Sequence, residues 1–181
     1  YFVGQLGKSP LAAMGFTFPV IMLIGCLFHG LASGVMTTSA QALGGGRKSK
    51  AAKLVTSGVL LIFAISLVLA LLGMSTTGWI FEKFGATGET LEQVKGYMNI
   101  WYFGCATASL SMTGNDLLIA AGDSKVASGM MIVGMIINVV FDPLFIFGWG
   151  PVPAMGIRGA ALATIGSQLV ATIAVLTILY R

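Results

Sequence analysis

An amide and a carboxylate lie four residues apart in an otherwise apolar stretch of this sequence, Asn138 and Asp142. Residues four apart share one face of a helix, so both side chains can serve one site. Their oxygens suit a small cation, and a carboxyl group in a low-dielectric site can also take up a proton near neutrality. Pro143 follows at once and bends the helix, which frees backbone carbonyls nearby. The pair therefore predicts a site for a cation or a proton.

Thr164 and His29 are predicted to lie at the level of this pair. Counted at about 1.5 Å per residue from the inner ends of their helices, both fall at about the height of Asp142. Thr164 can then add a hydroxyl ligand, although a Thr hydroxyl can also simply bond its own helix. His29 could support the site, or its imidazole could simply be buried with its hydrogen bonds satisfied. Matching heights in the membrane allow these residues to form one site. They do not show that the helix faces carrying them point toward one another.

Asn115 and Tyr97 are further candidates for a supporting polar network. They are separated by a whole number of helical turns, so they share a helix face. Tyr97 falls near the outer membrane boundary, where a tyrosine commonly anchors a helix. Asp116 lies near the inner end of the same helix, where it can be solvated or tied to a loop.

The composition requires a membrane environment. The 181 residues are 56% hydrophobic and 9% charged, with a mean hydropathy of +0.93, whereas about a quarter of a soluble domain is charged. Ten basic residues against six acidic ones are too few and too scattered for nucleic acid. Cys26 and Cys105 suggest neither a disulfide framework nor zinc. The ten methionines fit scattered apolar filler better than a drug-binding surface.

Uncharged runs long enough to span a bilayer predict an all-α polytopic membrane protein with about five transmembrane helices. We expect one partial transmembrane bundle over residues 1–181, with helices at about 10–43, 54–74, 92–122, 126–147 and 157–180.

The basic loop between the first two helices sets the orientation. Arg47, Lys48, Lys50 and Lys53 follow a glycine triplet and mark the cytoplasmic side of the cell membrane. The later turns then alternate between the outer and the cytoplasmic side of the membrane, which places Arg181 on the cytoplasmic side. The sequence begins at Tyr1 without a signal peptide and stops after an apolar run, so we expect a fragment of a longer protein.

Several segments together resemble the multidrug and toxic compound extrusion (MATE) family, in particular its prokaryotic branch similar to DNA-damage-inducible protein F. The resemblance covers nearly the whole chain in the family's order. The segments that carry it are Val3-Gly4-Gln5-Leu6-Gly7, Leu11-Ala12-Ala13, Gln41-Ala42-Leu43-Gly44, Gly122-Asp123-Ser124-Lys125, Asp142-Pro143-Leu144-Phe145-Ile146-Phe147-Gly148 and Gly156-Ile157-Arg158-Gly159-Ala160-Ala161-Leu162-Ala163-Thr164.

The resemblance implies two bundles of six helices, of which this chain would supply helices two to six of the first, with the second bundle absent. Asn138, Asp142 and Thr164 map to a cation or proton site of the family, with Na⁺ possible at Asn138 and Asp142. Tyr97 and Asn115 match polar positions of the family's fourth helix. The family's first-helix carboxylate would fall upstream of Tyr1, and Ile119 stands where many relatives carry an arginine.

The implied function is an antiporter that exports organic, often cationic, compounds by alternating access, coupled to Na⁺ or H⁺. Its partners would be a small organic molecule, the bilayer and the second bundle, with no nucleic acid and no cofactor beyond the coupling ion. We expect that the chain alone does not transport.

Three alternatives to this function stay open. A lipid-linked oligosaccharide flippase would need basic residues in mid-membrane, where this sequence has none. In a non-transporting scaffold subunit, Asn138 and Asp142 would only fasten helices. An enzyme is not expected, since no nucleophile with a base and an orienting partner appears.

Overall fold

The computed structural model describes residues 2–120, 122–149 and 152–179 of the chain. Every regular element within these residues is a helix, which confirms the predicted fold class. The elements are a short 3₁₀ helix η1 (Phe2–Leu6) and five α-helices, α1 (Lys8–Gly44), α2 (Lys48–Lys83), α3 (Gly88–Ala120), α4 (Ser124–Phe147) and α5 (Ile157–Leu179).

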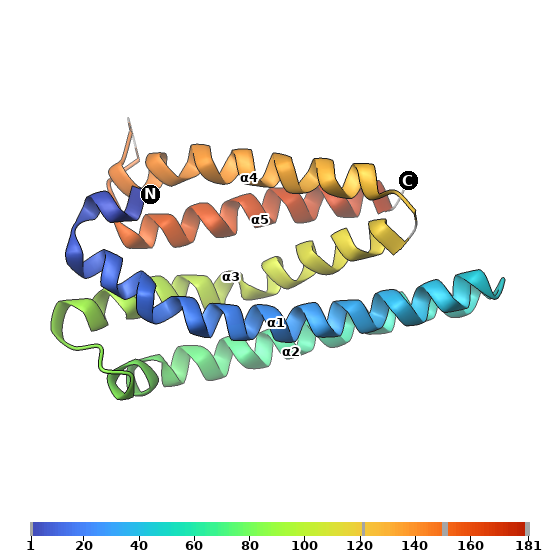
Figure 1. The fold of residues 1–181 in the computed structure, drawn as a ribbon, viewed down its shortest axis with the longest axis horizontal. Coiled ribbons are helices and arrows are strands. Elements are labelled where there is room, and N and C mark those ends of the chain that lie inside the picture. Colours follow the sequence, from blue (N-terminus) through green and yellow to red (C-terminus); the bar gives the residue numbers. More distant parts are fainter. Residues whose placement is uncertain (1, 121, 150–151, 180–181) are drawn as a thin grey trace.

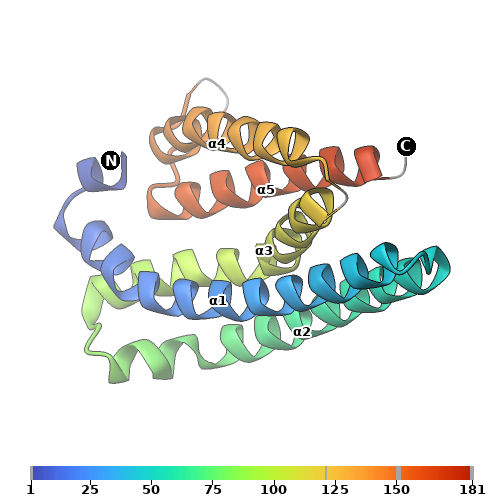
Figure 2. The ribbon, with the colours of Figure 1, turned by 45° about the vertical axis from the view of Figure 1, so that its right-hand side comes forward.

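The helices form two antiparallel hairpins with α3 between them. α1 and α2 make one hairpin, and α4 and α5 make the other, as Figures 1 and 2 show. α3 contacts all four of the other helices. Burial in the centre of the bundle explains why α3 can carry more polar residues than its neighbours, since its surface meets protein rather than lipid.

Among the described residues, four helices are long and apolar enough to cross a membrane, namely α1, α2, α4 and the Ile157–Ala174 part of α5. Their outward faces carry large apolar side chains that no described residue covers. Leu23 on α1 is 72% exposed, and Leu71 on α2 is 71% exposed. Such faces suit contact with lipid or with further helices.

The second helix is longer than the prediction of 54–74 at both ends. α2 begins at Lys48 and ends at Lys83, and α3 begins at Gly88 rather than at 92. Lys48, Lys50 and Lys53 therefore lie in the first turns of a helix, not in a loop. The physical reason is that lysine favours helix and needs no apolar environment, so a helix can continue into water where the apolar pattern ends.

The turns collect at the two ends of the bundle as the charge pattern predicts. Figure 1 shows the α1–α2 and α3–α4 turns toward one end, and the α2–α3 and α4–α5 connections toward the other. The predicted inner position of Arg181, and the predicted helix end at Tyr180, lie outside the described residues.

Close helix approaches occur where a glycine faces a large side chain. A Cβ atom at Gly104 on α3 would collide with Ile165 on α5, and one at Gly58 on α2 would collide with Val35 on α1. The absent side chains let the helix backbones come near one another, as is common in membrane bundles. The close approach of α3 to α5 constrains how the two helices are shifted and rotated relative to each other. These helices carry most of the polar groups described below.

Candidate functional site

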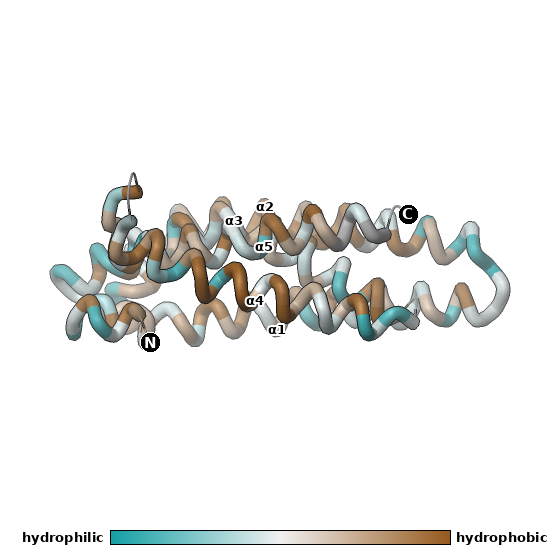
Figure 3. Tube along the Cα trace, turned by 90° about the horizontal axis from the view of Figure 1, so that it is seen from above, coloured by the Kyte–Doolittle hydropathy of each residue, from teal (hydrophilic) through white to brown (hydrophobic). Residues whose placement is uncertain are grey.

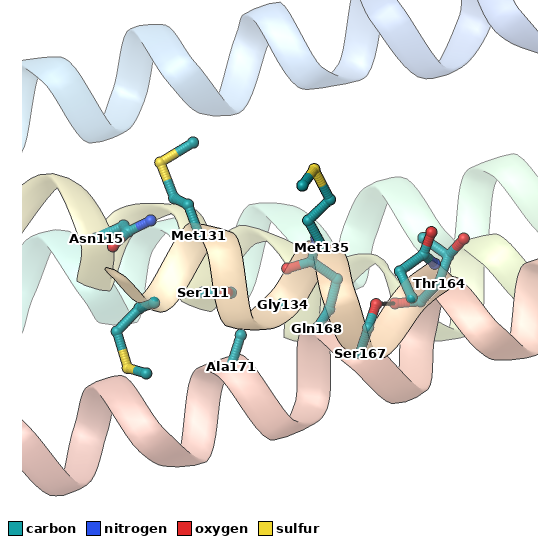
Figure 4. Close-up of a pocket in the computed structure, with 11 residues that line it drawn as sticks. Ser111, Asn115, Met131, Gly134, Met135, Thr164, Ser167, Gln168 and Ala171 are labelled. Carbon is teal, nitrogen blue, oxygen red and sulfur yellow. Dashed lines mark hydrogen bonds between the residues drawn. The ribbon is translucent and has the colours of Figure 1, made fainter. Parts of the chain in front are cut away.

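A cavity of about 370 Å³ lies between α3, α4 and α5. Figure 4 shows Asn115 near one end of it and Thr164 near the other. Its lining combines amides, hydroxyls and thioethers with small residues, and none of the lining side chains is charged. The lining residues are Ser111, Asn115, Met130, Met131, Gly134, Met135, Asn138, Thr164, Ser167, Gln168 and Ala171.

Three of the residues proposed from the sequence meet at this cavity. Asn115 comes from α3, Asn138 from α4 and Thr164 from α5. Asn138 lies in the second half of α4, and Thr164 lies in the first half of α5. Because α4 and α5 run in opposite directions, these two halves lie side by side. The antiparallel hairpin thus brings a mid-helix amide and a mid-helix hydroxyl to the same depth.

Asp142 lies outside the cavity lining, one helical turn beyond Asn138 on α4. Its side chain is half-buried. The Asp142 carboxylate is within electrostatic range of Tyr97 on α3, whose side chain is only 5% exposed. The structure therefore places Asp142 near Tyr97, one helical turn beyond the end of the cavity that Asn138 and Thr164 line.

His29 takes a different position from the other candidates. It is exposed on α1 and does not line the cavity. It lies within electrostatic range of Asp116 on α3. The Asp116 Oδ2 atom is buried and has no hydrogen-bond partner. His29 on α1 and Asp116 on α3 thus lie near each other and outside the cavity lining.

The polar groups of the cavity are only partly satisfied by the protein. The Thr164 hydroxyl donates to the Ala160 carbonyl at 3.0 Å, and the Ser167 hydroxyl donates to the Thr164 carbonyl at 2.8 Å. The Thr164 Oγ1 atom can still accept a hydrogen bond or ligate a cation. The Asn115 Oδ1 atom is buried without a partner. A buried, unpaired carbonyl oxygen is costly, and a bound donor or cation would satisfy it.

Ser111, Ser167 and Gln168 are lining residues that sequence reasoning missed. A signal for two of them exists, because Ser111 precedes Asn115 by four residues and Thr164 precedes Gln168 by four. Both helices thus repeat the spacing of Asn138 and Asp142. Polar pairs at this spacing on three successive helices point to one shared interior surface.

Three of the ten methionines lie at the cavity. Met130, Met131 and Met135 line its α4 side. Figure 4 shows Met131 and Met135 extending from α4 on the side away from α5. Both are more than 60% exposed, at 63% and 62%. Flexible thioether side chains adapt to varied apolar ligands.

The chemistry available in the cavity is binding rather than bond making. The lining offers amide and hydroxyl oxygens for a cation or a hydrogen-bonding solute, beside an adaptable apolar wall. Among the described residues, no three His, Cys, Asp or Glu side chains group as metal ligands. A small cation here would therefore rely on neutral oxygens with one nearby carboxylate, Asp142.

The bundle and its internal polar cavity define a multi-pass helical membrane protein. The MatE family model matches residues 1–144, so the chain belongs to this family of membrane transporters. This confirms the resemblance noted in the sequence.

Known relatives extend beyond this chain. It is 38% identical, over 171 residues, to a protein named FAD transporter from Shewanella oneidensis; the match covers 94% of this chain and 38% of that protein. An outward-facing structure of a multidrug resistance MATE family transporter matches with a TM-score of 0.91 at 30% identity, over 99% of this chain and 39% of that one. An inward-facing structure of a multidrug resistance MATE family transporter matches with a TM-score of 0.92 at 30% identity. This match covers 98% of this chain and 40% of that one. The chain spans about two fifths of these relatives' length.

Proposed function

We propose that the full-length protein containing this chain is an ion-coupled antiporter that exports organic, often cationic, compounds by alternating access. The observation that carries the proposal is the cavity itself. It lies inside a family bundle and combines unpaired amide oxygen at Asn115 with a flexible thioether wall. Neutral oxygens attract the cationic part of a solute, and the thioethers contact its apolar part.

Asp142, Asn138 and Thr164 are proposed as the coupling site for Na⁺ or H⁺. Asn138 and Thr164 offer oxygens at one end of the cavity, and Asp142 lies one helical turn away. Ion uptake changes the charge of the Asp142 carboxylate and its interaction with Tyr97. Because only differential affinity can shift a conformational equilibrium, the ion must favour one orientation of the bundle over the other.

Alternating access fits a bundle that moves as a unit. This chain matches an outward-facing transporter and an inward-facing one almost equally well, with TM-scores of 0.91 and 0.92. The similarity supports a rigid body whose internal packing is kept while its partner bundle moves relative to it. A second bundle would supply the other wall of the transport pathway.

The decisive experiment compares two Asp→Asn variants of one helix in the full-length protein. Efflux of a fluorescent organic cation from proteoliposomes is measured under separate Na⁺ and pH gradients. Asp142→Asn should lower ion-driven efflux by about tenfold or more, as expected for a coupling energy of a few kcal/mol. Asp123→Asn is the matched control, because Asp123 only caps α4 by accepting from the Val126 N–H at 3.2 Å, and Asn caps equally well.

The gradient that drives the wild-type protein identifies the coupling ion. Unchanged efflux in Asp142→Asn, with the same yield and monodispersity as wild type, would return Asp142 to a helix-fastening role. In that case the scaffold interpretation of Asn138 and Asp142 gains support.

FAD is a second candidate substrate, because a relative that is 38% identical to this chain is named FAD transporter. FAD carries two phosphate groups, yet no lysine or arginine lines the cavity. Export of FAD would therefore need cations from outside these lining residues. Loading the same proteoliposomes with FAD and measuring its fluorescence outside distinguishes the two substrates.

A further inference from the structure

The turn between α1 and α2 carries a concentration of positive charge that the proposed transport function does not use. Four basic side chains surround an open groove of about 630 Å³. All four are exposed. The residues that line the groove are Gly46, Arg47, Lys48, Ser49, Lys50 and Lys53.

Among the described residues, these cations form no ion pair. Glu82, at the far end of α2, is the first acidic residue of the sequence. Within the described part of the chain, the one ion pair joins Lys95 to Glu92, and it lies on α3. Four uncompensated positive charges within a few residues repel one another, and an anion between them would reduce that repulsion.

The start of α2 adds backbone donors to the same place. Arg47 precedes the helix without forming a side-chain cap, and no acidic residue lies in the first turn. The first backbone hydrogen bond of α2 runs from the Ala51 N–H to the Arg47 carbonyl at 3.0 Å. The Arg47 N–H donates to the Ala42 carbonyl of α1 at 2.9 Å. The N–H groups of Lys48, Ser49 and Lys50 precede the first helical hydrogen bond, so they have no acceptor within α2 and lie at the positive end of its dipole.

The position of the groove indicates where the anion comes from. α1 and α2 have 37 and 36 residues, so each is about 55 Å long at about 1.5 Å per residue, against a hydrocarbon core of about 30 Å. Figure 1 shows the hairpin reaching past the other helices at this end, and Figure 3 shows hydrophilic residues there. Leu43, next to the turn, is 46% exposed. Basic groups beside exposed apolar side chains fit the headgroup region of a bilayer.

We propose that the groove at residues 46–53 binds the phosphate groups of anionic phospholipids and anchors the α1–α2 hairpin to the leaflet that it faces. The basic side chains supply the charge, the free N–H groups supply directed hydrogen bonds, and the exposed leucine lies beside the acyl chains. The helix dipole and the lysines act on the same anion, which favours phosphate over a neutral headgroup.

The test measures lipid binding to the purified full-length protein by native mass spectrometry. Dioleoyl phosphatidylglycerol and dioleoyl phosphatidylcholine are added in equal amounts, at low and at high salt. We expect the wild-type protein to retain phosphatidylglycerol preferentially and to lose that preference at high salt. The double variant Lys48→Gln/Lys50→Gln keeps Arg47 and Lys53, so the orientation of the protein in the membrane should not change. The variant should lower the preference for phosphatidylglycerol about fivefold for each cation removed.

Two controls make the result specific. Lys83→Gln/Arg158→Gln removes two exposed cations from the opposite end of the bundle, and should leave the preference unchanged. Lys48→Arg/Lys50→Arg keeps the charge and should bind as wild type does, which separates loss of binding from loss of folding. An equal effect of both Gln variants, or no preference in the wild-type protein, would overturn the proposal. Complete displacement of the lipid by millimolar inorganic phosphate would overturn the lipid assignment and leave a site for free phosphate.

Discussion

Asn138 of α4 and Thr164 of α5 line the same cavity, because the two helices run in opposite directions and both residues lie at a similar distance from the connection that joins them. The pairing depends on hairpin geometry, since residues at matching distances from an antiparallel connection lie side by side. Thr164 is bonded only to its own helix, so its hydroxyl oxygen retains free acceptor capacity toward Asn138 and the cavity.

The Thr164 hydroxyl is expected to serve the coupling ion rather than the fold. Thr164→Val keeps the shape and removes one oxygen, which should raise the half-saturating ion concentration about fivefold, the equivalent of about 1 kcal/mol. The measurement is the ion dependence of efflux in proteoliposomes. Thr177→Val is the matched control, because the Thr177 hydroxyl makes the same kind of bond to the Ile173 carbonyl, at 2.7 Å, from an exposed position. Equal effects of the two substitutions would exclude a special role for Thr164.

Asn115 is expected to contact the transported solute. Its buried Oδ1 atom lacks a protein partner, so Asn115→Leu should raise the KM for an organic cation about tenfold, as expected for loss of a buried polar partner. Asn99→Leu, on the exposed surface of the same helix, should leave the KM unchanged. Initial efflux rates over a range of substrate concentrations give both values. A lower maximal rate at constant KM would instead assign Asn115 to a conformational step.

Tyr97 and Asp142 are expected to act as a pair. In a double-mutant cycle, Tyr97→Phe and Asp142→Asn should show an interaction energy of about 0.5 kcal/mol or more in the affinity for a fluorescent organic cation. Tyr102→Phe serves as the comparison, because Tyr102 is buried on the same helix but packs against Gly73 on α2. Additive effects in the Tyr97 cycle would show that the proximity of the two side chains has no energetic consequence.

Gly104 is expected to determine the packing of α3 against α5. Gly104→Ala places a methyl group against Ile165 and should destabilise the protein by about 1–3 kcal/mol, the usual cost of overpacking. Gly30→Ala meets open space on α1 and provides the control for helix propensity alone. Thermal unfolding in detergent, followed by size-exclusion chromatography, measures both. A Tm for Gly104→Ala at or above that of Gly30→Ala would contradict the packing argument.

Much of the architecture is determined locally. Long apolar runs between clusters of charge are enough to specify helices that cross a bilayer, because every backbone polar group must be satisfied within the segment. The basic residues at 47–53 predict which end stays inside. The helix ends were predicted less well, since Lys48 to Lys53 continue a helix into water, where hydropathy carries no signal.

The tertiary structure decided which polar residues meet. Helical spacing places Asn138 and Asp142 on one face of their own helix, but the rotation of that helix against its neighbours comes from contacts such as Gly104 with Ile165. Those contacts bring Asn115, Asn138 and Thr164 to one cavity. They leave Asp142 near Tyr97, and His29 near Asp116 rather than at the cavity. Depth along the membrane normal follows from counting residues along one helix. Convergence requires the relative rotation of several helices, which the close packing of the bundle decides.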